Sequence, residues 1–394
     1  RALLPSRAPG LAGSGICFTH TMMFIEPAFC SLVRPFTQPV GPQNDPGDGR
    51  LRAPRARLVR SFAVRILLVV NSFASSVTAR NTVIVHRALS RDHEVQVVET
   101  NRRGHATRFA QDAAHRGVDL VVSFGGDGTL NEVATGVAGT ETALGVLPGG
   151  STNVFARTIG LPNDPTTAVG RLVDGLTDPD ANIRPIGLGR VNGRFFCFHT
   201  GVGYDAAVVR TVETRASLKR WAGHPLFIYA ALKTWLVGYD RRHPHFSVTA
   251  DGAIGGPGGL VIDPSDGIAR RFDPSRTVND GYFTVVMNTN PYTFLGNRPL
   301  DLSPAAGLDK PLVAITFRTM SASAIIGTLL GALKGGGVEP SEHVASFENV
   351  EELIIEHHSP FPYQVDGDYL GETGRLHFRH VPDAVRLLFP VDAH

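Results

Sequence analysis

A glycine-rich turn lies between a predicted strand and a predicted helix in residues 118–131, which read VDLVVSFGGDGTLN. The residues from Leu120 to Phe124 form a short apolar run, and Leu130, Val133 and Val137 recur at helical spacing after the turn. Glycine lets a ligand approach the backbone, and the N-terminus of a helix offers N–H groups to phosphate. The pattern therefore predicts a phosphate-binding turn made of Gly125, Gly126, Asp127, Gly128 and Thr129.

Asp127 is an unexpected residue in such a turn, because a carboxylate repels phosphate. A bound Mg²⁺ ion would resolve the conflict, since hard cations bridge carboxylates and phosphates. The alternative is an ordinary strand–helix turn in which the Asp127 side chain caps the helix. The turn alone leaves both interpretations open.

Other polar loops follow predicted strands. The strand at 64–70 ends at Asn71, the strand at 94–99 ends at Thr100, and the strand at 144–147 runs into Gly149–Asn153. Strands that alternate with helices imply a parallel sheet, and ligands bind such sheets at the carboxyl ends of the strands. These loops and the glycine turn share that edge, which favours a phosphate site there.

The composition fits a protein of two domains. The chain has 394 residues, of which 42% are hydrophobic and 19% are charged. The net charge of +2 gives no argument for a nucleic-acid partner. The three cysteines show no metal-ligand spacing, so we expect a reducing cytoplasm. No apolar run is long enough for a transmembrane helix.

Residues 1–60 and the residues after 184 differ in pattern from the α/β region at 61–184. We interpret 1–60, which is rich in Pro and Gly, as a disordered leader or as sequence upstream of a misassigned start. A signal peptide is disfavoured because no small-residue cleavage site follows a clean apolar core. Residues 185–375 show short strands with turns, typical of an antiparallel sandwich, and the Gly-, Asp- and Pro-rich stretch 251–280 is predicted to be a long loop. Helices are predicted at Ala216–Val237 and Ala322–Leu333.

Four blocks together resemble the catalytic region of the diacylglycerol kinase and sphingosine kinase family. They are GGDGTLNE at 125–132, LPGGSTNVFAR at 147–157, GVGYDA at 201–206 and QVDGD at 364–368. They occur in the family's order and spacing over roughly Val64–Pro390, and the chain looks most similar to bacterial, actinobacterial lipid kinases. The first block alone also resembles NAD kinase, but the later blocks do not.

The resemblance implies an α/β plus β fold: an N-terminal parallel-sheet nucleotide domain and a β-sandwich lipid domain, with the segment 376–394 returning to the first domain. It implies ATP and Mg²⁺, with Asp127 in the magnesium network. It implies that Gly125–Asn131 holds the phosphates. The other residues that it places at the nucleotide are Asn71, Ser72, Phe73, Ala74, Ser75, Thr100, Ser151 and Asn153.

Two departures from the family concern chemistry. The second metal loop of the family usually reads Asp-Asp-Gly-Leu, and here Asp309 is followed by Lys, Pro and Leu, so a Mg²⁺ ion at Asp309 is an expectation on a weakened motif. Asp368 stands where the family usually has a Glu as proton acceptor. The residues around it leave two interpretations open: Asp366 and Asp368 share a strand face as a catalytic pair, or Asp366–Gly367 is a hairpin turn. Glu372 is the alternative base.

The predicted function is an ATP-dependent lipid kinase that phosphorylates diacylglycerol. Sphingoid bases, ceramide and other lipid alcohols are open as acceptors, and the alternatives are an NAD kinase and a catalytically silent binding protein. We expect a cytoplasmic protein that binds membranes reversibly at its lipid substrate, and a homodimer is left open. The basic and aromatic segment Arg215–Tyr239 is the candidate membrane contact; packing against the sandwich is the alternative.

Overall fold

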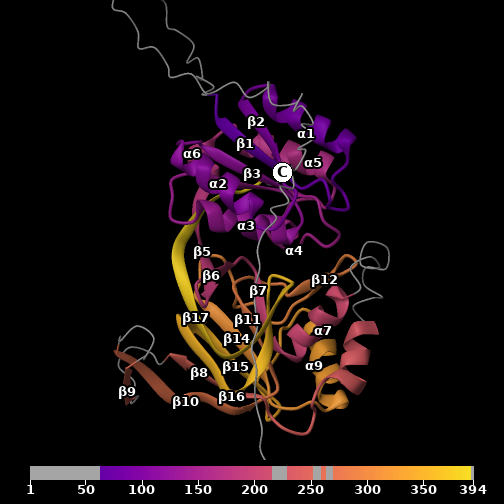
Figure 1. Cartoon of the computed structure of the whole chain (residues 1–394), viewed down its shortest axis with the longest axis vertical. Helices are drawn as coiled ribbons and strands as arrows, with labels where there is room; N and C mark the ends of the chain where they lie inside the picture. Colours follow the sequence, from indigo (N-terminus) through magenta and orange to yellow (C-terminus); the bar gives the residue numbers. More distant parts are fainter. Residues whose placement is uncertain (1–62, 215–228, 252–258, 263–268, 392–394) are drawn as a thin grey trace, which may run out of the picture. The chain divides into compact units, whose positions relative to one another are not determined.

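The computed structural model describes residues 63–214, 229–251, 259–262 and 269–391 (Figure 1). All of these residues fall within one compact unit that spans Arg57–His394. The predicted leader lies outside the described residues. So does most of the predicted helix Ala216–Val237, including Lys219 and Arg220.

The first part of the described chain is a parallel sheet with helices on both faces. Its strands run in the order β4–β3–β1–β2. They are β1 Arg65–Val70, β2 Glu94–Glu99, β3 Leu120–Gly125 and β4 Ala143–Pro148. The helices are α1 Ala79–Ser90, α2 His105–His115, α3 Asp127–Val137, α4 Val154–Thr158, α5 Pro165–Gly175 and α6 Pro179–Asn182. The predicted parallel α/β arrangement is confirmed.

Sequence chemistry explains how these elements pack. Every residue of β3 is buried, as expected for a Val- and Leu-rich strand that is covered on both faces. Helices α2 and α3 contact each other closely because α3 has Gly136 at the contact: a Cβ there would stand 2.6 Å from the Cβ of Ala110. This close contact holds α3 against α2. The N-terminus of α3 follows directly after β3 in the chain.

The second part of the chain is largely antiparallel. Its main strands lie in the order β15–β14–β11–β7–β16–β17. Their bounds are β7 His199–Gly203, β11 Phe283–Met287, β14 Leu312–Phe317, β15 Val344–Val350, β16 Glu352–Val365 and β17 Asp368–Leu388. The remaining strands are β5 Ile183–Val191, β6 Arg194–Phe196, β8 Phe246–Asp251, β12 Thr293–Leu295 and β13 Arg298–Leu300. The predicted antiparallel region is thus confirmed.

Strand β17 joins the two parts of the chain (yellow in Figure 1). It pairs antiparallel with β16 and β5, and near its end Arg386 and Leu387 pair parallel with β4. The described strands of the parallel core and of the main antiparallel region therefore belong to one 15-stranded sheet. The antiparallel region is thus continuous with the parallel sheet through the end of β17, which lies in the segment expected to return to the first domain.

The predicted long loop at 251–280 is wrong. Within it lie β9 Gly259–Ile262 and most of β10 Ala269–Gly281, which pair antiparallel, and β10 also pairs with β8. The strands were missed because Gly, Asp and Pro lower strand propensity, whereas pairing to a neighbouring strand decides the backbone conformation.

Within the described residues, the helices of the second part are α7 Tyr204–Glu213, a helical stretch at 229–233 that runs into a π-helical turn at Thr234–Gly238, and α9 Ala322–Ala332. The predicted helix Ala216–Val237 is therefore helical over the part of it that the structure describes. The prediction for Ala322–Leu333 is confirmed to within one residue at its end. None of the helices in the described residues is both long and apolar enough to cross a membrane.

Candidate active site

The loops after β3 and β4 touch backbone to backbone. The Gly149 N–H donates to the Gly125 carbonyl at 2.7 Å, and a Cβ on Gly149 would stand 2.8 Å from the Gly125 Cα. A Cβ on Gly150 would stand 2.9 Å from the Gly126 Cα. Only glycine fits at positions 149 and 150, so the close approach of the two loops explains the glycines of the second block. The result is an open backbone cradle of the kind that holds phosphate.

Asn71 ties the first loop to this cradle. Its Nδ2 donates to the Thr129 Oγ1 at 2.8 Å, and its Oδ1 accepts from the Phe73 N–H at 3.1 Å. Thr100, at the end of β2, is buried, and its N–H donates to the Val70 carbonyl at 2.9 Å. The predicted loops therefore lie at the carboxyl edge of the sheet, as the alternation of strands and helices required.

Asp127 caps a helix, although not its own. Its Oδ2 accepts from the Val154 N–H at 3.0 Å and its Oδ1 accepts from the Phe155 N–H at 3.2 Å. These are first-turn amides of α4, which gain a carboxylate acceptor at their positive end. The capping alternative is therefore present in the structure, with α4 in place of α3, and it joins the two glycine loops.

Leu130, Asn131 and Asn153, all predicted at the nucleotide, have buried side chains. Leu130 packs inside, and Asn131 donates from Nδ2 to the Asp366 Oδ2 at 2.8 Å and to the Phe195 carbonyl at 2.9 Å. Asn153 has a φ of 50° and bonds both the N–H and the carbonyl of Gly150. These side chains shape the loops through contacts within the protein, so a role of Leu130, Asn131 and Asn153 at the nucleotide stays a prediction. Ser72, Phe73, Ser75 and Ser151 are exposed at the edge, and Ala74 is half-buried.

The hairpin interpretation of the last block is confirmed. Val365 at the end of β16 pairs with Asp368 at the start of β17, and the turn between them is Asp366–Gly367. Both turn residues have positive φ, 47° and 81°, which is the conformation of a tight hairpin that Asp-Gly favours. The two aspartates therefore do not share a strand face, and the expected pair is split.

Asp366 points inward and is 6% exposed. Its carboxylate accepts from the N–H groups of Cys197, Phe198 and His199 at 2.7, 3.0 and 3.1 Å, and from Asn131. Burial raises the pKa of Asp366 to about 6, and the hydrogen bonds to its carboxylate hold the pKa below what burial alone would produce. With its oxygens engaged, Asp366 anchors the hairpin to α3 and β7, so its predicted catalytic role is corrected to a positioning one.

Asp368 points the other way, toward the glycine turn. A Cβ built on Gly128 would stand 3.8 Å from the Asp368 Oδ2. The carboxylate therefore lies across the first turn of α3, at the predicted phosphate cradle. Glu372, the alternative base, instead pairs with Arg210 at 3.1 Å and is 46% exposed. The structure thus favours Asp368 as the carboxylate that can reach a group bound at the cradle.

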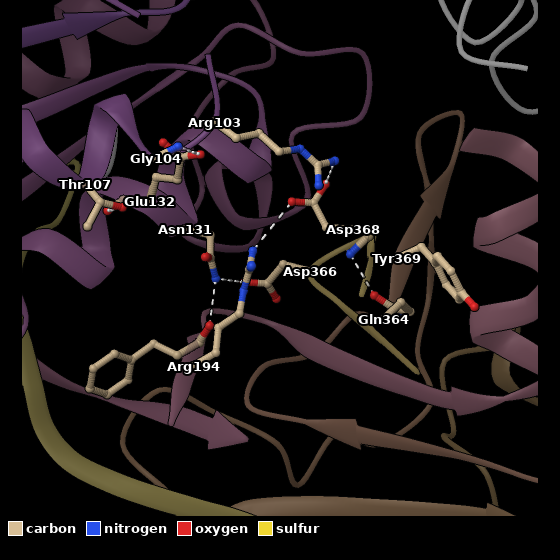
Figure 2. A network of polar contacts seen from close by, with 12 residues as sticks. Arg103, Gly104, Thr107, Asn131, Glu132, Arg194, Gln364, Asp366, Asp368 and Tyr369 are labelled. Atoms are coloured by element: carbon tan, nitrogen blue, oxygen red, sulfur yellow. Dashed lines mark hydrogen bonds and ion pairs between the residues drawn. The ribbon is translucent and has the colours of Figure 1, made fainter. Parts of the chain in front are cut away.

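Two arginines that sequence reasoning missed surround Asp368 (Figure 2). The Arg103 Nη2 lies 3.3 Å from one carboxylate oxygen, and the Arg194 Nη2 lies 3.6 Å from the other. Arg103 follows Thr100 in the loop after β2, so a basic residue at the carboxyl edge was a usable signal. Arg194 offered none, because it begins β6 in a local hairpin with β5 and meets Asp368 only in the folded chain.

A second, partly buried carboxylate, Asp205, contacts the hairpin through Gln364. The Gln364 Nε2 donates to the Asp205 Oδ2 at 2.9 Å, and the Gln364 Oε1 accepts from the Gly367 N–H at 2.8 Å. The Tyr292 hydroxyl also donates to Asp205. Burial raises the pKa of Asp205, and these hydrogen bonds oppose that rise. The GVGYDA and QVDGD blocks therefore meet, and their residue types are explained by this bridge.

The described residues offer few clustered side chains that could bind a metal ion. No group of three or more His, Cys, Asp or Glu side chains among the described residues could hold one. Asp309 lies in a turn before β14 without a second such ligand, so a Mg²⁺ ion there stays a prediction. Asp127 offers one carboxylate at the cradle. That fits a Mg²⁺ ion that takes most of its ligands from phosphates and water, as Mg²⁺ commonly does.

The fold and the site define a class of protein. A parallel sheet presents a glycine cradle for phosphate, and an antiparallel region supplies a carboxylate across that cradle. This is the arrangement of a phosphotransferase that acts on a hydroxyl group, since phosphoryl transfer needs positioning, charge neutralisation and a base.

Comparisons with known proteins agree with this class. Residues 65–183 match the family model described as "Diacylglycerol kinase catalytic domain". The chain is 40% identical to a diacylglycerol kinase of Bacillus subtilis over 203 residues, which covers 50% of this chain and 63% of that relative. It is 31% identical to a YegS-like lipid kinase of Klebsiella pneumoniae over 56% of this chain and 72% of the relative. A YegS-like relative from Pseudomonas aeruginosa is 29% identical over 83% of this chain and 94% of its own length.

The fold comparison covers the chain more fully. A crystal structure of a diacylglycerol kinase from Bacillus anthracis superposes with a TM-score of 0.55 at 19% identity, covering 82% of this chain and 96% of that chain. The chain belongs to the diacylglycerol kinase family of lipid kinases.

Proposed function

We propose that this protein transfers the γ-phosphate of ATP to a lipid hydroxyl, with diacylglycerol as the leading acceptor and phosphatidic acid as the product. The observation that carries the proposal is the Asp368 carboxylate across the glycine turn, where a Cβ on Gly128 would stand 3.8 Å from it. A base placed there can reach a hydroxyl that attacks a phosphate held by the cradle.

In the proposed reaction Asp368 accepts the proton of the lipid hydroxyl. The lipid oxygen forms a bond to the γ-phosphorus as the bond from that phosphorus to the β,γ-bridging oxygen breaks, and ADP leaves. The backbone of Gly125–Thr129 holds the phosphates, and Asp366 fixes Asp368 through the hairpin. A Mg²⁺ ion bound with the nucleotide would supply charge neutralisation, with Asp127 as its protein carboxylate.

The general base is tested by three variants assayed at saturating ATP. Asp368→Asn keeps the size of the side chain and removes the base, so turnover should fall by about 10²–10⁴-fold. Asp368→Glu should keep activity, because Glu is the residue that the family resemblance implies at this position. Glu372→Gln is the matched control and should behave like the wild type. A dead Glu372→Gln with an active Asp368→Asn would move the base to Glu372.

The acceptor is tested by radiolabelled ATP with a panel of diacylglycerol, ceramide, a sphingoid base, a glycolipid and NAD. Labelled phosphatidic acid supports the leading proposal, and another labelled lipid would change the acceptor only. Labelled NAD alone would overturn a lipid reaction. No product with any acceptor would favour a silent binding protein.

We also propose that the protein meets its lipid substrate by binding the membrane surface reversibly. The support is apolar exposure on two neighbouring elements. Leu236 is 54% exposed and Val237 is 84% exposed, while on α9, which has no charged residue, Ile326 is 56% exposed. The Trp235 Nε1 donates to the Met320 carbonyl at 3.3 Å, just before α9, so the elements lie together. Exposed cations flank them at Lys233, Arg241, Arg242 and Lys334.

A further inference from the structure

The charged groups around Asp368 come from separate parts of the chain (Figure 2). Arg103 leaves the loop between β2 and α2, and Arg194 begins β6. Glu213, at the end of α7, lies 3.7 Å from the Arg103 Nη2, and its Oε1 also accepts the Tyr369 N–H at 3.2 Å. Two guanidinium groups and two carboxylates therefore converge beside the glycine turn.

The ion pairs in this cluster are loose. The distances of 3.3, 3.6 and 3.7 Å exceed the roughly 2.7–2.9 Å of a strong charge-assisted hydrogen bond. The Arg103 side chain is 69% exposed and that of Arg194 is 38% exposed. Exposed pairs of this kind contribute little to stability, about 0–1 kcal/mol. The arginines are therefore not explained by holding the fold together.

Donor capacity is left over in the cluster. Each guanidinium carries five N–H donors. The Arg194 Nε is buried and has no hydrogen-bond partner within the described part of the chain. A buried donor without a partner costs free energy, so its retention points to a ligand that is bound part of the time.

The Arg103 loop is fixed in place from below. The Glu132 carboxylate accepts from the Gly104 N–H at 2.8 Å and from the Ala106 N–H at 3.1 Å, and Thr107 donates to the Glu132 carbonyl at 3.0 Å. Glu132 belongs to α3, the helix that begins at the glycine turn. The start of the Arg103 side chain is therefore held at a set place relative to the phosphate cradle.

We infer that Arg103 and Arg194 form a binding subsite for the terminal phosphate of the nucleotide, and this inference rests on the proposed function. A terminal phosphate carries more negative charge than a carboxylate and offers several acceptor oxygens, which suits two planar guanidinium groups. In the unliganded protein Asp368 and Glu213 occupy the arginines.

The subsite also accounts for how Asp368 becomes available. When the phosphate engages the two arginines, the Asp368 oxygens lose their ion-pair partners and can accept the proton of the lipid hydroxyl. ATP thus releases the base that the transfer needs, and ADP, which lacks the terminal phosphate, does not.

The test is equilibrium binding of ATP and of ADP, each with MgCl₂, to the wild type, Arg103→Met and Arg194→Met. Met keeps the length of the stem and removes the charge. The dissociation constant for ATP should rise about ten-fold or more in each variant, and that for ADP should change less than about three-fold. Arg103→Lys should recover part of the ATP affinity, because it restores the charge without the planar donors.

Arg116→Met is the matched control. Arg116 forms an exposed ion pair at 2.8 Å with Asp112 at the far end of α2 from Arg103, about 15 Å away along the helix. The Arg116→Met variant should bind both nucleotides as the wild type does. Thermal unfolding of each variant checks folding, and if Arg194→Met does not fold, the exposed Arg103 carries the test.

The outcomes separate the subsite from the reaction. Unchanged ATP binding in both arginine variants, with lipid phosphorylation by the wild type, would overturn the subsite and leave the function standing. Equal losses for ATP and ADP would also overturn it, because the arginines would then serve another part of the nucleotide. Selective loss of ATP binding in a protein that phosphorylates nothing would support the subsite and refute the function.

Discussion

Among single residues, Asp366 and Asp368 show that backbone conformation can place two identical side chains in different environments. The residues are two positions apart, and an extended strand would place them on one face. The positive φ at Asp366 and Gly367 sends Asp366 inward and leaves Asp368 at the glycine turn. The Asp366 carboxylate accepts from buried N–H donors, whereas the Asp368 carboxylate forms ion pairs with Arg103 and Arg194 beside the glycine turn.

The raised pKa of Asp366 predicts a pH-dependent contribution to stability. Its pKa is about 6 in the folded protein and about 3.9 when unfolded, so the folded state binds the proton more tightly. The contribution is full below about pH 4 and is lost as the pH rises through about 6, which amounts to about 3 kcal/mol. Denaturant unfolding of the wild type and Asp366→Asn should therefore give a difference in unfolding free energy that falls between pH 4 and 7.

Gly170→Ala, which changes no ionisable group, is the control for that measurement and should give a difference that does not change with pH. A difference for Asp366 that grows from pH 3 to 5 would mean that the N–H donors outweigh burial and lower the pKa instead. That result would leave Asp366 as an anchor but make it an ionised one.

At the scale of elements, the contact between the β3 and β4 loops decides whether the cradle exists. Gly150→Ala would place a Cβ 2.9 Å from the Gly126 Cα, which is backbone and cannot move aside like a flexible side chain. We expect a loss of about 1–3 kcal/mol in unfolding free energy together with weaker ATP binding. Thermal unfolding and nucleotide titration measure the two effects.

Gly170→Ala is the matched control for this substitution. Gly170 lies within α5, and a Cβ there meets no atom within 4 Å. Alanine at that position should stabilise the protein by about 0.5–1 kcal/mol through helix propensity and leave ATP binding unchanged. Equal behaviour of the two variants would mean that the loops separate readily and that the close approach is not required.

At the scale of the whole molecule, the exposed apolar side chains of 234–238 and α9 predict membrane binding. Flotation with vesicles of phosphatidylcholine and phosphatidylglycerol should show about ten-fold weaker binding for the double variant Leu236→Ser/Ile326→Ser, because each change removes apolar area from the contact. Val83→Ser, at an equally exposed apolar position on α1, should bind as the wild type does. Equal binding by all three proteins would assign the membrane contact to another surface.

The two parts of the chain are connected at the site by one helix and one strand. Asn131 of α3 contacts Asp366 of the hairpin, and Asp368 reaches the first turn of the same helix. Strand β17 carries the chain from that hairpin back to β4. Asp368, the proposed base, and the glycine turn, the proposed phosphate site, are therefore held in one continuous framework.

The sequence by itself determined the parallel core and its site edge. Strand runs such as Leu120–Phe124 are apolar throughout, and their Gly and Asn endings are local signals that need no tertiary contact. The ordered blocks also determined the family, because glycine turns and a hairpin Asp-Gly impose backbone geometry at fixed positions. The strands at 259–262 and 269–281 could not be predicted from such local signals, since turn-forming residues can lie in a strand when a neighbouring strand pairs with it.

Tertiary structure alone decided the roles of the polar side chains. Asn131, Asn153 and Asp366 have residue types that suit a ligand site, and the fold buries each of them against backbone groups. Arg194 gave no local signal, and it meets Asp368, which lies far along the chain, only in the folded protein. Residue type fixes what a side chain can donate or accept, whereas burial and long-range pairing fix which partner it meets.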